Sequence, residues 1–119
     1  MQRVFQTTFT IDGTLAADHT FTWKVPFPCQ IIHVSMSNSS ANAGTLDLGT
    51  SADADGYLDG KSFGVSAACT EIDAYSEFDG ALAGGQFPKV ADDTVLHITI
   101  KDHASHMANV CVVLTFTEG

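Results

Sequence analysis

Apolar and polar residues alternate with a period of two in several separate stretches of the chain. In residues 5–11 ("FQTTFTI"), the apolar side chains fall at odd positions, with Thr7 among them, and the even positions are polar. In residues 21–27 ("FTWKVPF"), the odd positions hold Phe21, Trp23, Val25 and Phe27. This period is that of a half-buried β-strand. Pro26 lies on the polar side of the second stretch and cannot donate to a ladder, so we expect a sheet edge or a strand end there.

The parity of the apolar positions reverses after Pro28. In residues 29–37 ("CQIIHVSMS") the apolar set becomes Ile32, Val34 and Met36, all at even positions. A bend or bulge at Pro28 and Cys29 would carry the chain across to a second sheet.

The middle of the chain predicts shorter strands separated by loops. Residues 45–49 ("TLDLG") place Leu46 and Leu48 inward, and residues 61–66 ("KSFGVS") place Phe63 and Val65 inward. Residues 67–88 show no regular period apart from a candidate strand around residues 71–78. A connection of this length in a small domain is usually functional or ordered by a partner.

The last third of the chain returns to clear alternation. Residues 94–102 ("TVLHITIKD") and 109–119 ("NVCVVLTFTEG") each predict a strand, and "HASHMA" between them fits a hairpin connection. With about seven or eight strands and no amphipathic helix, the chain is predicted to be all-β: an antiparallel β-sandwich, with a jelly roll as one form of it. Residues 1–119 form a single domain in this interpretation, with the irregular segment at about 67–88.

Charge and composition exclude several classes of partner. Five Lys and Arg against fourteen Asp and Glu give a net charge of -9, which repels a nucleic-acid backbone or an anionic membrane. The first residues contain no apolar signal region, so we expect a protein made and kept inside a cell, or released from it by lysis. The three cysteines are widely spaced and predict free, buried or half-buried thiols.

An acidic, glycine-rich stretch, "TLDLGTSADADGYLDG", covers residues 45–60. This stretch can be aligned with an EF-hand loop by placing Gly56 at the position of the turn glycine. The ligand positions 3, 5 and 9 are then occupied by Asp53, Asp55 and Asp59, but the first and last positions hold Ser51 and Ser62. Without the bidentate Glu, an EF-hand is rejected. A weak calcium site at the three aspartates and a simple acidic turn remain as alternatives.

Other candidate chemistry is weaker. His97, His103 and His106, with Asp102 beside them, could form a metal site of a small jelly-roll enzyme, against the alternative of exposed loop histidines. A carboxylate pair for glycoside cleavage would combine Asp73 with Glu77 or Asp79. No nucleophile motif surrounds a serine or cysteine, so no catalytic residue and no cofactor is predicted.

A carbohydrate-binding module would need exposed aromatic side chains. Trp23 and most phenylalanines occupy the predicted core positions, which leaves Tyr57, Tyr75 and Phe78 as candidates for an exposed set. Carbohydrate or receptor binding is therefore the second hypothesis for function.

Two segments carry a family resemblance: residues 21–60, from "FTWKVPFP" through "TLDLGTSADADGYLDG", and residues 92–119, "DDTVLHITIKDHASHMANVCVVLTFTEG". Together they resemble small virion proteins of tailed phages, in particular head decoration or cement proteins. The shared pattern is a strand ending in a Pro-Phe turn, an "I-x-x-V-S" strand, an "L-x-L-G-T" strand with a "D-x-D-G" turn, and a closing "T-x-L-x-I-x-I" hairpin.

The resemblance implies a structural, non-enzymatic protein on the outer surface of a phage capsid, made in the host cytoplasm. Its partner would be the major capsid protein, and a homotrimer would be the favoured oligomer. In this interpretation "ADADGYLDG" is an acidic turn at the rim of the sandwich. The segment at 67–88 would be an arm that clasps a neighbouring subunit. A fibre or baseplate component is the alternative within the same resemblance.

Overall fold

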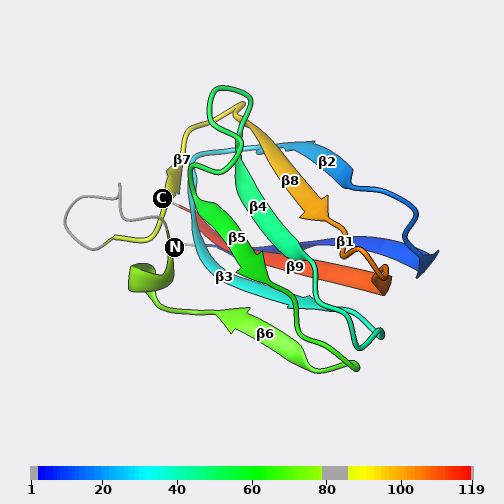
Figure 1. The fold of residues 1–119 in the computed structure, drawn as a ribbon. Helices are drawn as coiled ribbons and strands as arrows, with labels where there is room; N and C mark the ends of the chain where they lie inside the picture. The colour runs from blue at the N-terminus through cyan, green and yellow to red at the C-terminus, as the bar shows by residue number, and fades with distance from the viewer. Residues whose placement is uncertain (1–2, 79–85, 119) are drawn as a thin grey trace.

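The computed structural model describes residues 3–78 and 86–118, and within them it contains nine strands and no α-helix (Figure 1). One 3-10 turn, η1, spans Tyr75–Glu77. The strands are β1 Val4–Thr14, β2 His19–Lys24, β3 Cys29–Ser37, β4 Thr45–Thr50, β5 Leu58–Ser62, β6 Cys69–Ile72, β7 Lys89–Val90, β8 Val95–Lys101 and β9 Ala108–Glu118. No helix in this part of the chain is long and apolar enough to cross a membrane.

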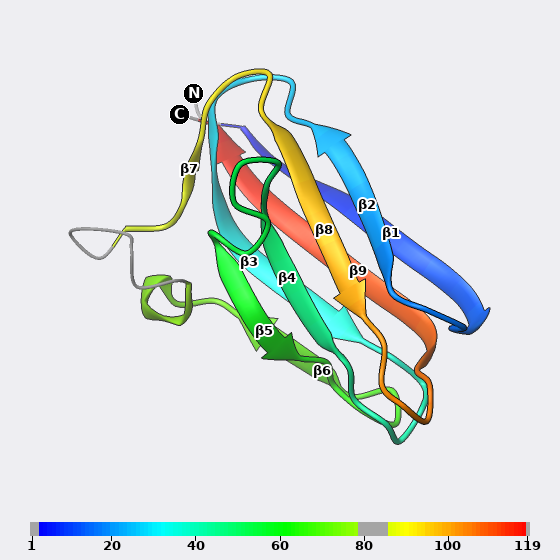
Figure 2. The same ribbon diagram turned by 45° about the horizontal axis from the view of Figure 1, so that its top comes forward.

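Two antiparallel sheets pack face to face, which confirms the predicted β-sandwich (Figures 1 and 2). One sheet has the order β1-β9-β3-β6, with the two-residue β7 also paired to β3, and the other has the order β2-β8-β4-β5. Apart from β7, the strands thus pair first with last, second with second-last and so on inward: β1 with β9, β2 with β8, β3 with β6 and β4 with β5. This is a ribbon of paired strands rolled into two sheets, the jelly-roll arrangement.

The rolled ribbon explains why one predicted hairpin is absent. β8 and β9 follow one another in sequence but belong to different sheets, so residues 102–107 form an arch between the sheets. The hairpin expected at "HASHMA" was wrong for this reason. Among the described strands, only β4 and β5 are both consecutive and paired, and their loop is the tip of the ribbon.

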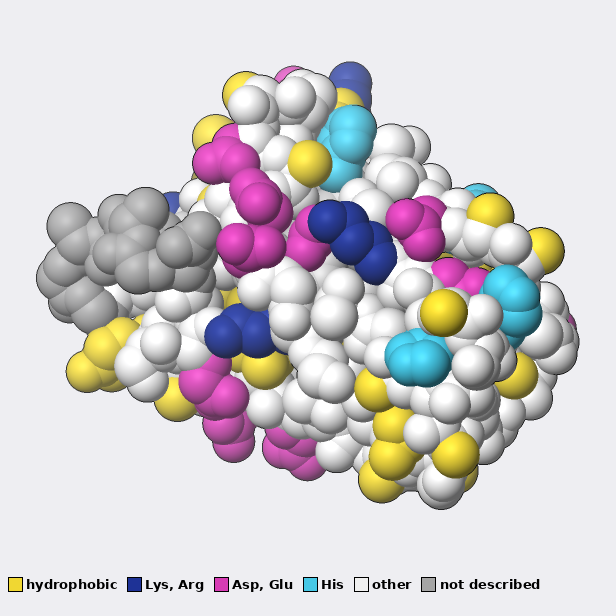
Figure 3. Space-filling model, in the orientation of Figure 1, with side chains coloured by type: hydrophobic (Ala, Val, Ile, Leu, Met, Phe, Trp, Pro, Cys, Tyr) yellow, Lys and Arg dark blue, Asp and Glu magenta, His cyan; other side chains and the backbone are white. Residues whose placement is uncertain are grey.

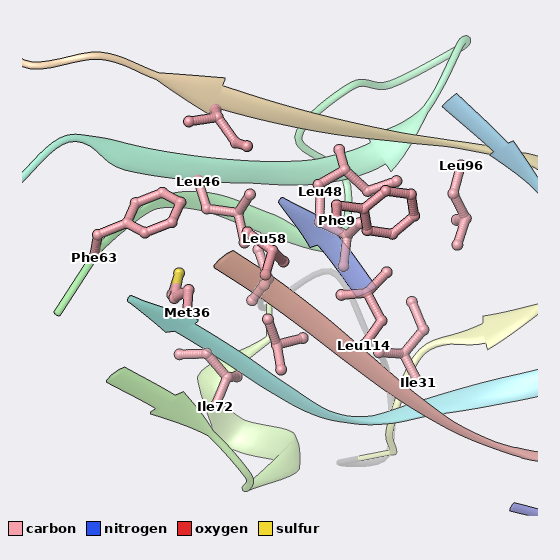
Figure 4. Packing of buried hydrophobic residues seen from close by; sticks show 14 of the residues in the cluster. Phe9, Ile31, Met36, Leu46, Leu48, Leu58, Phe63, Ile72, Leu96 and Leu114 are labelled. Carbon is pink, nitrogen blue, oxygen red and sulfur yellow. The ribbon is translucent and has the colours of Figure 1, made fainter. Parts of the chain in front are cut away.

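The core lies between the sheets and follows the predicted alternation (Figure 4). Leu96, Ile98 and Ile100 of β8 are fully buried, and the apolar positions of β9 that face them from the other sheet are buried as well. Near the chain ends, the ring of Phe116 stacks on Phe5 at 4.8 Å between centroids. Burying side chains of this kind stabilises the fold by roughly 1.5 to 3 kcal/mol each.

The crossing from the second strand to the third occurs as predicted, but the reversal of parity lies further along. β2 is an edge strand and ends at Lys24, so Pro26 follows the strand end. The register of β3 against β9 shifts between Ile31 and His33, and Ile31 is fully buried while Ile32 is only half-buried. The bulge is therefore inside β3, and placing it at Pro28 and Cys29 was wrong.

The segment around β5 differs from the prediction at one residue. β5 begins earlier, at Leu58, and Phe63 lies just beyond its end with a buried side chain. Val65 is 37% exposed, so its predicted inward position was wrong. Gly64 takes the place between them, in a bridge to Ser37 that joins this loop to the end of β3.

The irregular segment at 67–88 contains short pieces of structure. β6 overlaps the candidate strand at residues 71–78 only at Glu71 and Ile72, so that predicted strand was wrong beyond Ile72, where η1 follows. β7 begins directly after the segment. Residues 79–85 lie outside the described residues. The proposed clasping role of the segment stays a prediction.

Candidate interaction surfaces

The acidic loop at residues 51–57 is held by backbone hydrogen bonds around Asp53. The amide of Thr50 donates to the Asp53 carbonyl at 2.9 Å, and the amide of Gly56 donates to the same oxygen at 3.1 Å. Tyr57 then returns the chain to the sheet by donating to the Leu48 carbonyl at 2.8 Å. No residue of the loop has a positive φ, so these hydrogen bonds, and not an unusual backbone conformation, define the turn.

Two of the three predicted calcium ligands come together in this loop. A hydrogen bond with Asp53, burial and the negative charge of Asp53 raise the pKa of Asp55 above its ordinary value, as expected when two carboxyl groups share a site. Asp59 lies beyond the loop, exposed on β5. In residues 3–78 and 86–118, no three His, Cys, Asp or Glu side chains converge as a metal site would require. The calcium site stays a prediction.

Asp47, in the same acidic stretch, has a structural role that the sequence did not reveal. Its side chain is nearly buried at the centre of the four-stranded sheet. One carboxylate oxygen accepts the Gly60 amide at 2.8 Å, and the other lies 2.9 Å from Lys101 Nζ. Asp47 thus connects β4 to both of its neighbours, β5 and β8. The only local sign of this was an acidic residue between two buried leucines.

This side of the molecule is rich in charge (Figure 3). The view shows acidic side chains gathered next to the loop between β4 and β5, with basic side chains close by. The outward positions of this sheet include Asp47 and Lys101, as well as Lys24 at the edge.

The histidines predicted as metal ligands are separated. His106 and His103 lie in the arch after β8, whereas His97 lies on the outer face of β8, opposite Gly49 of β4 and Thr22 of β2. Within the arch, Asp102 accepts from His106 Nδ1 at 2.7 Å, and His103 Nδ1 accepts the Ser105 amide at 2.9 Å. The arch histidines therefore serve the turn itself.

The aromatic residues predicted for carbohydrate binding do not form one exposed set. Tyr75 is 52% exposed on η1. Phe78 is 3% exposed and packs edge-on to Phe87 at 6.0 Å, so its predicted exposure was wrong. Tyr57 is half-buried against the core, where burial raises the pKa of its phenol. No pocket is formed by the described residues.

The candidate glycosidase pair also has a local role. Glu77 Oε1 accepts the amides of Asp73 at 3.2 Å and Ala74 at 3.1 Å. The side chain of the last residue of the 3-10 turn thereby caps the N-terminal end of that turn. Asp79 lies outside the described residues, so its part of the pairing is not tested.

The outer face of the five-stranded sheet contrasts with the charged face. Three parallel rows of side chains run across β1, β9 and β3: Gln6, Thr115 and His33; Thr8, Val113 and Ser35; and Thr10 with Cys111. Gln6 donates to Thr115 Oγ1 at 3.1 Å. Ser37 extends the face along β3. None of these residues is Asp, Glu, Lys or Arg.

The strand order defines the chain as a two-sheet, jelly-roll domain. No family model and no curated protein sequence matches it. Among solved structures, the chain is similar to a chain in a structure described as the cyanophage Pam1 capsid asymmetric unit, with a TM-score of 0.55 and 18% sequence identity. The match covers 99% of this chain and 85% of that chain. At this identity the likeness shows a shared fold.

Proposed function

We propose that this chain is a structural protein of a phage particle, which binds the outside of the capsid and stabilises it as a decoration or cement protein. The observation that carries the proposal is the fold shared with a chain of a phage capsid over nearly the full length of this protein. Because the match covers most of both chains, the two are of similar size. A small jelly roll in that setting fits an accessory position on a shell.

The proposed partner is the major capsid protein, and the proposed oligomer is a homotrimer, which suits a threefold or quasi-threefold position on a shell. Binding to assembled shells and not to free subunits adds free energy to the assembled state, by the same linkage through which any ligand stabilises the form it binds. This role requires surface complementarity and no catalytic residue. Its location would be the virion surface, after synthesis in the host cytoplasm.

The charged surfaces of the domain are suited to such a contact. With a net charge of -9, the protein would be attracted to a basic patch on the shell, and that attraction would accelerate binding at low salt. The segment at 67–88 would add a second contact by clasping a neighbouring subunit. Its exposed Tyr75 is a suitable anchor, since tyrosine is enriched at protein interfaces.

A carbohydrate- or receptor-binding role in a fibre or baseplate is the second candidate. Lectin domains also use the jelly roll, and Tyr75 could stack on a sugar ring. With Phe78 buried, however, the aromatic residues predicted for this role do not form a platform.

The test mixes the purified protein with phage shells that lack it. Co-sedimentation at a fixed ratio, together with a higher temperature of shell disruption, would support the cement function. A glycan-binding screen on the same preparation separates the second candidate. Binding to a glycan with no effect on shells would reject the cement proposal.

A further inference from the structure

Nine of the outward residues of β1, β9 and β3, at the middle of these strands, form one surface, which we name the β1–β9–β3 face. Its members are Gln6, Thr8, Thr10, Cys111, Val113, Thr115, His33, Ser35 and Ser37. The pairing register aligns them in rows, with Val113 opposite Thr8 on one side and Ser35 on the other. The face belongs to three adjacent strands of one sheet.

This face carries no carboxylate and no Lys or Arg, although the chain has fourteen acidic residues. Charged side chains border the face: Asp12 at the far end of β1, Glu71 on β6, Lys89 on β7, and the Arg3–Glu118 ion pair near the termini. Glu71 lies opposite Ser35 in the register, and its carboxylate is 3.5 Å from His33 Nε2. The outer face of the other sheet, by contrast, carries Asp47 and Lys101 near its centre. On the outer face of the five-stranded sheet, the charges therefore lie around these nine residues and not among them.

The net charge of the protein indicates whether an uncharged face is better suited to a second copy of the chain or to a basic shell surface. Two copies with a charge of -9 each repel, and carboxylates placed opposite carboxylates in an interface cost several kcal/mol. A basic shell surface, in contrast, would be attracted to the acidic parts of the domain. A surface without carboxylates is where two copies can meet at the least electrostatic cost.

The composition of the face fits the same partner. Interface cores are depleted of Lys, Glu and Asp, none of which is a member of the face, and its Thr, Val and Cys side chains have little rotamer freedom to lose on association. We propose that copies of this chain associate with one another through the β1–β9–β3 face. This inference rests on the proposed homo-oligomer and deepens it, because it assigns the surface through which the oligomer forms.

Two matched substitutions test the assignment. Thr8→Asp places a carboxylate on the β1–β9–β3 face, and Thr22→Asp places one on the outer face of the other sheet. Both threonines are exposed and lie on edge strands, so the two variants carry the same added charge at similar exposure. Sedimentation velocity should show an oligomer for the wild type and for Thr22→Asp, and at least about tenfold weaker association for Thr8→Asp.

A second measurement uses no substitution. Cys111 lies on the face, so its reaction with a thiol reagent should slow at least about tenfold as the wild-type protein is concentrated through its association range. Cys69, exposed on the edge strand β6, is the internal reference within the same molecule. This readout remains usable if Thr8→Asp fails to fold.

A monomeric wild type at all concentrations would overturn the inference, as would an oligomer that Thr22→Asp disrupts and Thr8→Asp does not. Each variant is also mixed with shells. Shell binding by a monomer overturns this inference and leaves the cement function standing. An oligomer that Thr8→Asp disrupts, and that does not bind shells, supports the inference and rejects the cement function.

Discussion

The carboxylate of Asp102 lies 2.7 Å from Nδ1 of His106, four residues further along the arch between β8 and β9. The other carboxylate oxygen accepts the amides of His103 at 2.9 Å and Met107 at 2.8 Å. The side chain of Asp102 is only 6% exposed, and the side chain of Met107 is fully buried beside it. One acidic residue therefore organises the turn that carries the chain from one sheet to the other.

Replacing Asp102 should destabilise the fold in a way that depends on pH. Burial raises the pKa of Asp102, but the hydrogen bonds from His106, Met107 and His103 outweigh it, so the net pKa lies below the ordinary value. A lowered pKa means that this stabilisation is present above the unfolded pKa of about 4 and is lost as the pH falls through the folded pKa.

We expect Asp102→Ala to lower the free energy of unfolding at pH 7 by about 2 kcal/mol or more, because it leaves two amides without their acceptor. Asp102→Asn keeps an acceptor and should cost less. Both deficits should shrink in urea unfolding below pH 4. Asp12→Asn, at the exposed end of β1, is the control, and an equal pH-dependent deficit there would contradict the assignment.

Gly49 should tolerate no side chain. A Cβ built on this glycine of β4 would overlap the carbonyl oxygen of Asp53 and the backbone of Ala54 in the acidic loop. Gly49→Ala should therefore lower the free energy of unfolding by about 3 kcal/mol or more, since backbone atoms must move.

Gly60 provides the comparison for that substitution. Nothing lies within 4 Å of a Cβ at Gly60, but its φ of +63° disfavours an L-residue. Gly60→Ala should cost only about 1 to 2 kcal/mol by thermal unfolding. Gly49 has no positive φ, so equal losses for the two variants would show that the acidic loop moves away from the added Cβ at little cost, against the prediction.

The cysteines should differ widely in reactivity. Cys29 is 1% exposed, and burial raises the pKa of its thiol, so both access and thiolate content are low. Cys69 is exposed. In dilute native protein, Cys69 should react with a thiol reagent at least about 100-fold faster than Cys29. Cys69→Ser should remove the fastest phase, and a fast phase that survives this substitution would contradict the predicted order.

The sequence could predict the strands wherever apolar and polar residues alternate without interruption. In β8, polar residues separate the apolar residues Leu96, Ile98 and Ile100, so only one face of the strand can be buried, and a register slip of one residue would expose the apolar set. In β3 the two adjacent isoleucines, Ile31 and Ile32, are equally apolar. Their order of burial depends on the bulge against β9, which local composition does not encode.

The connections and the polar contacts could not be predicted for a related reason. The residues between β8 and β9 would suit either a hairpin or an arch, and the choice depends on which sheet each strand joins. The roles of Asp47 and Asp102 depend on partners in other strands or on the path of the arch. Phe78 looked exposed because the sequence does not show that Phe87, nine residues later, packs against it.

The repulsion between Asp53 and Asp55 allows the predicted calcium site to be tested, and the repulsion itself can be measured without calcium. Because the pKa of Asp55 is raised, its protonated form is favoured in the folded protein. Because this pKa is raised on folding, the stability that the protonated Asp55 contributes is fully present below the unfolded pKa of about 4. It is lost as the pH rises through the folded pKa. At pH 7 the two carboxylates therefore repel each other.

Asp55→Asn should consequently raise the midpoint of thermal unfolding at pH 7 and leave it nearly unchanged at pH 3. Calcium at millimolar concentration relieves the same repulsion if it binds the pair, so it should raise the midpoint of the wild type and not that of Asp55→Asn. Asp92→Asn, in the turn before β8, is the charge-matched control. An equal response of wild type and Asp55→Asn to calcium would remove the loop as its binding site, whereas a response confined to the wild type would assign the ion to Asp53 and Asp55.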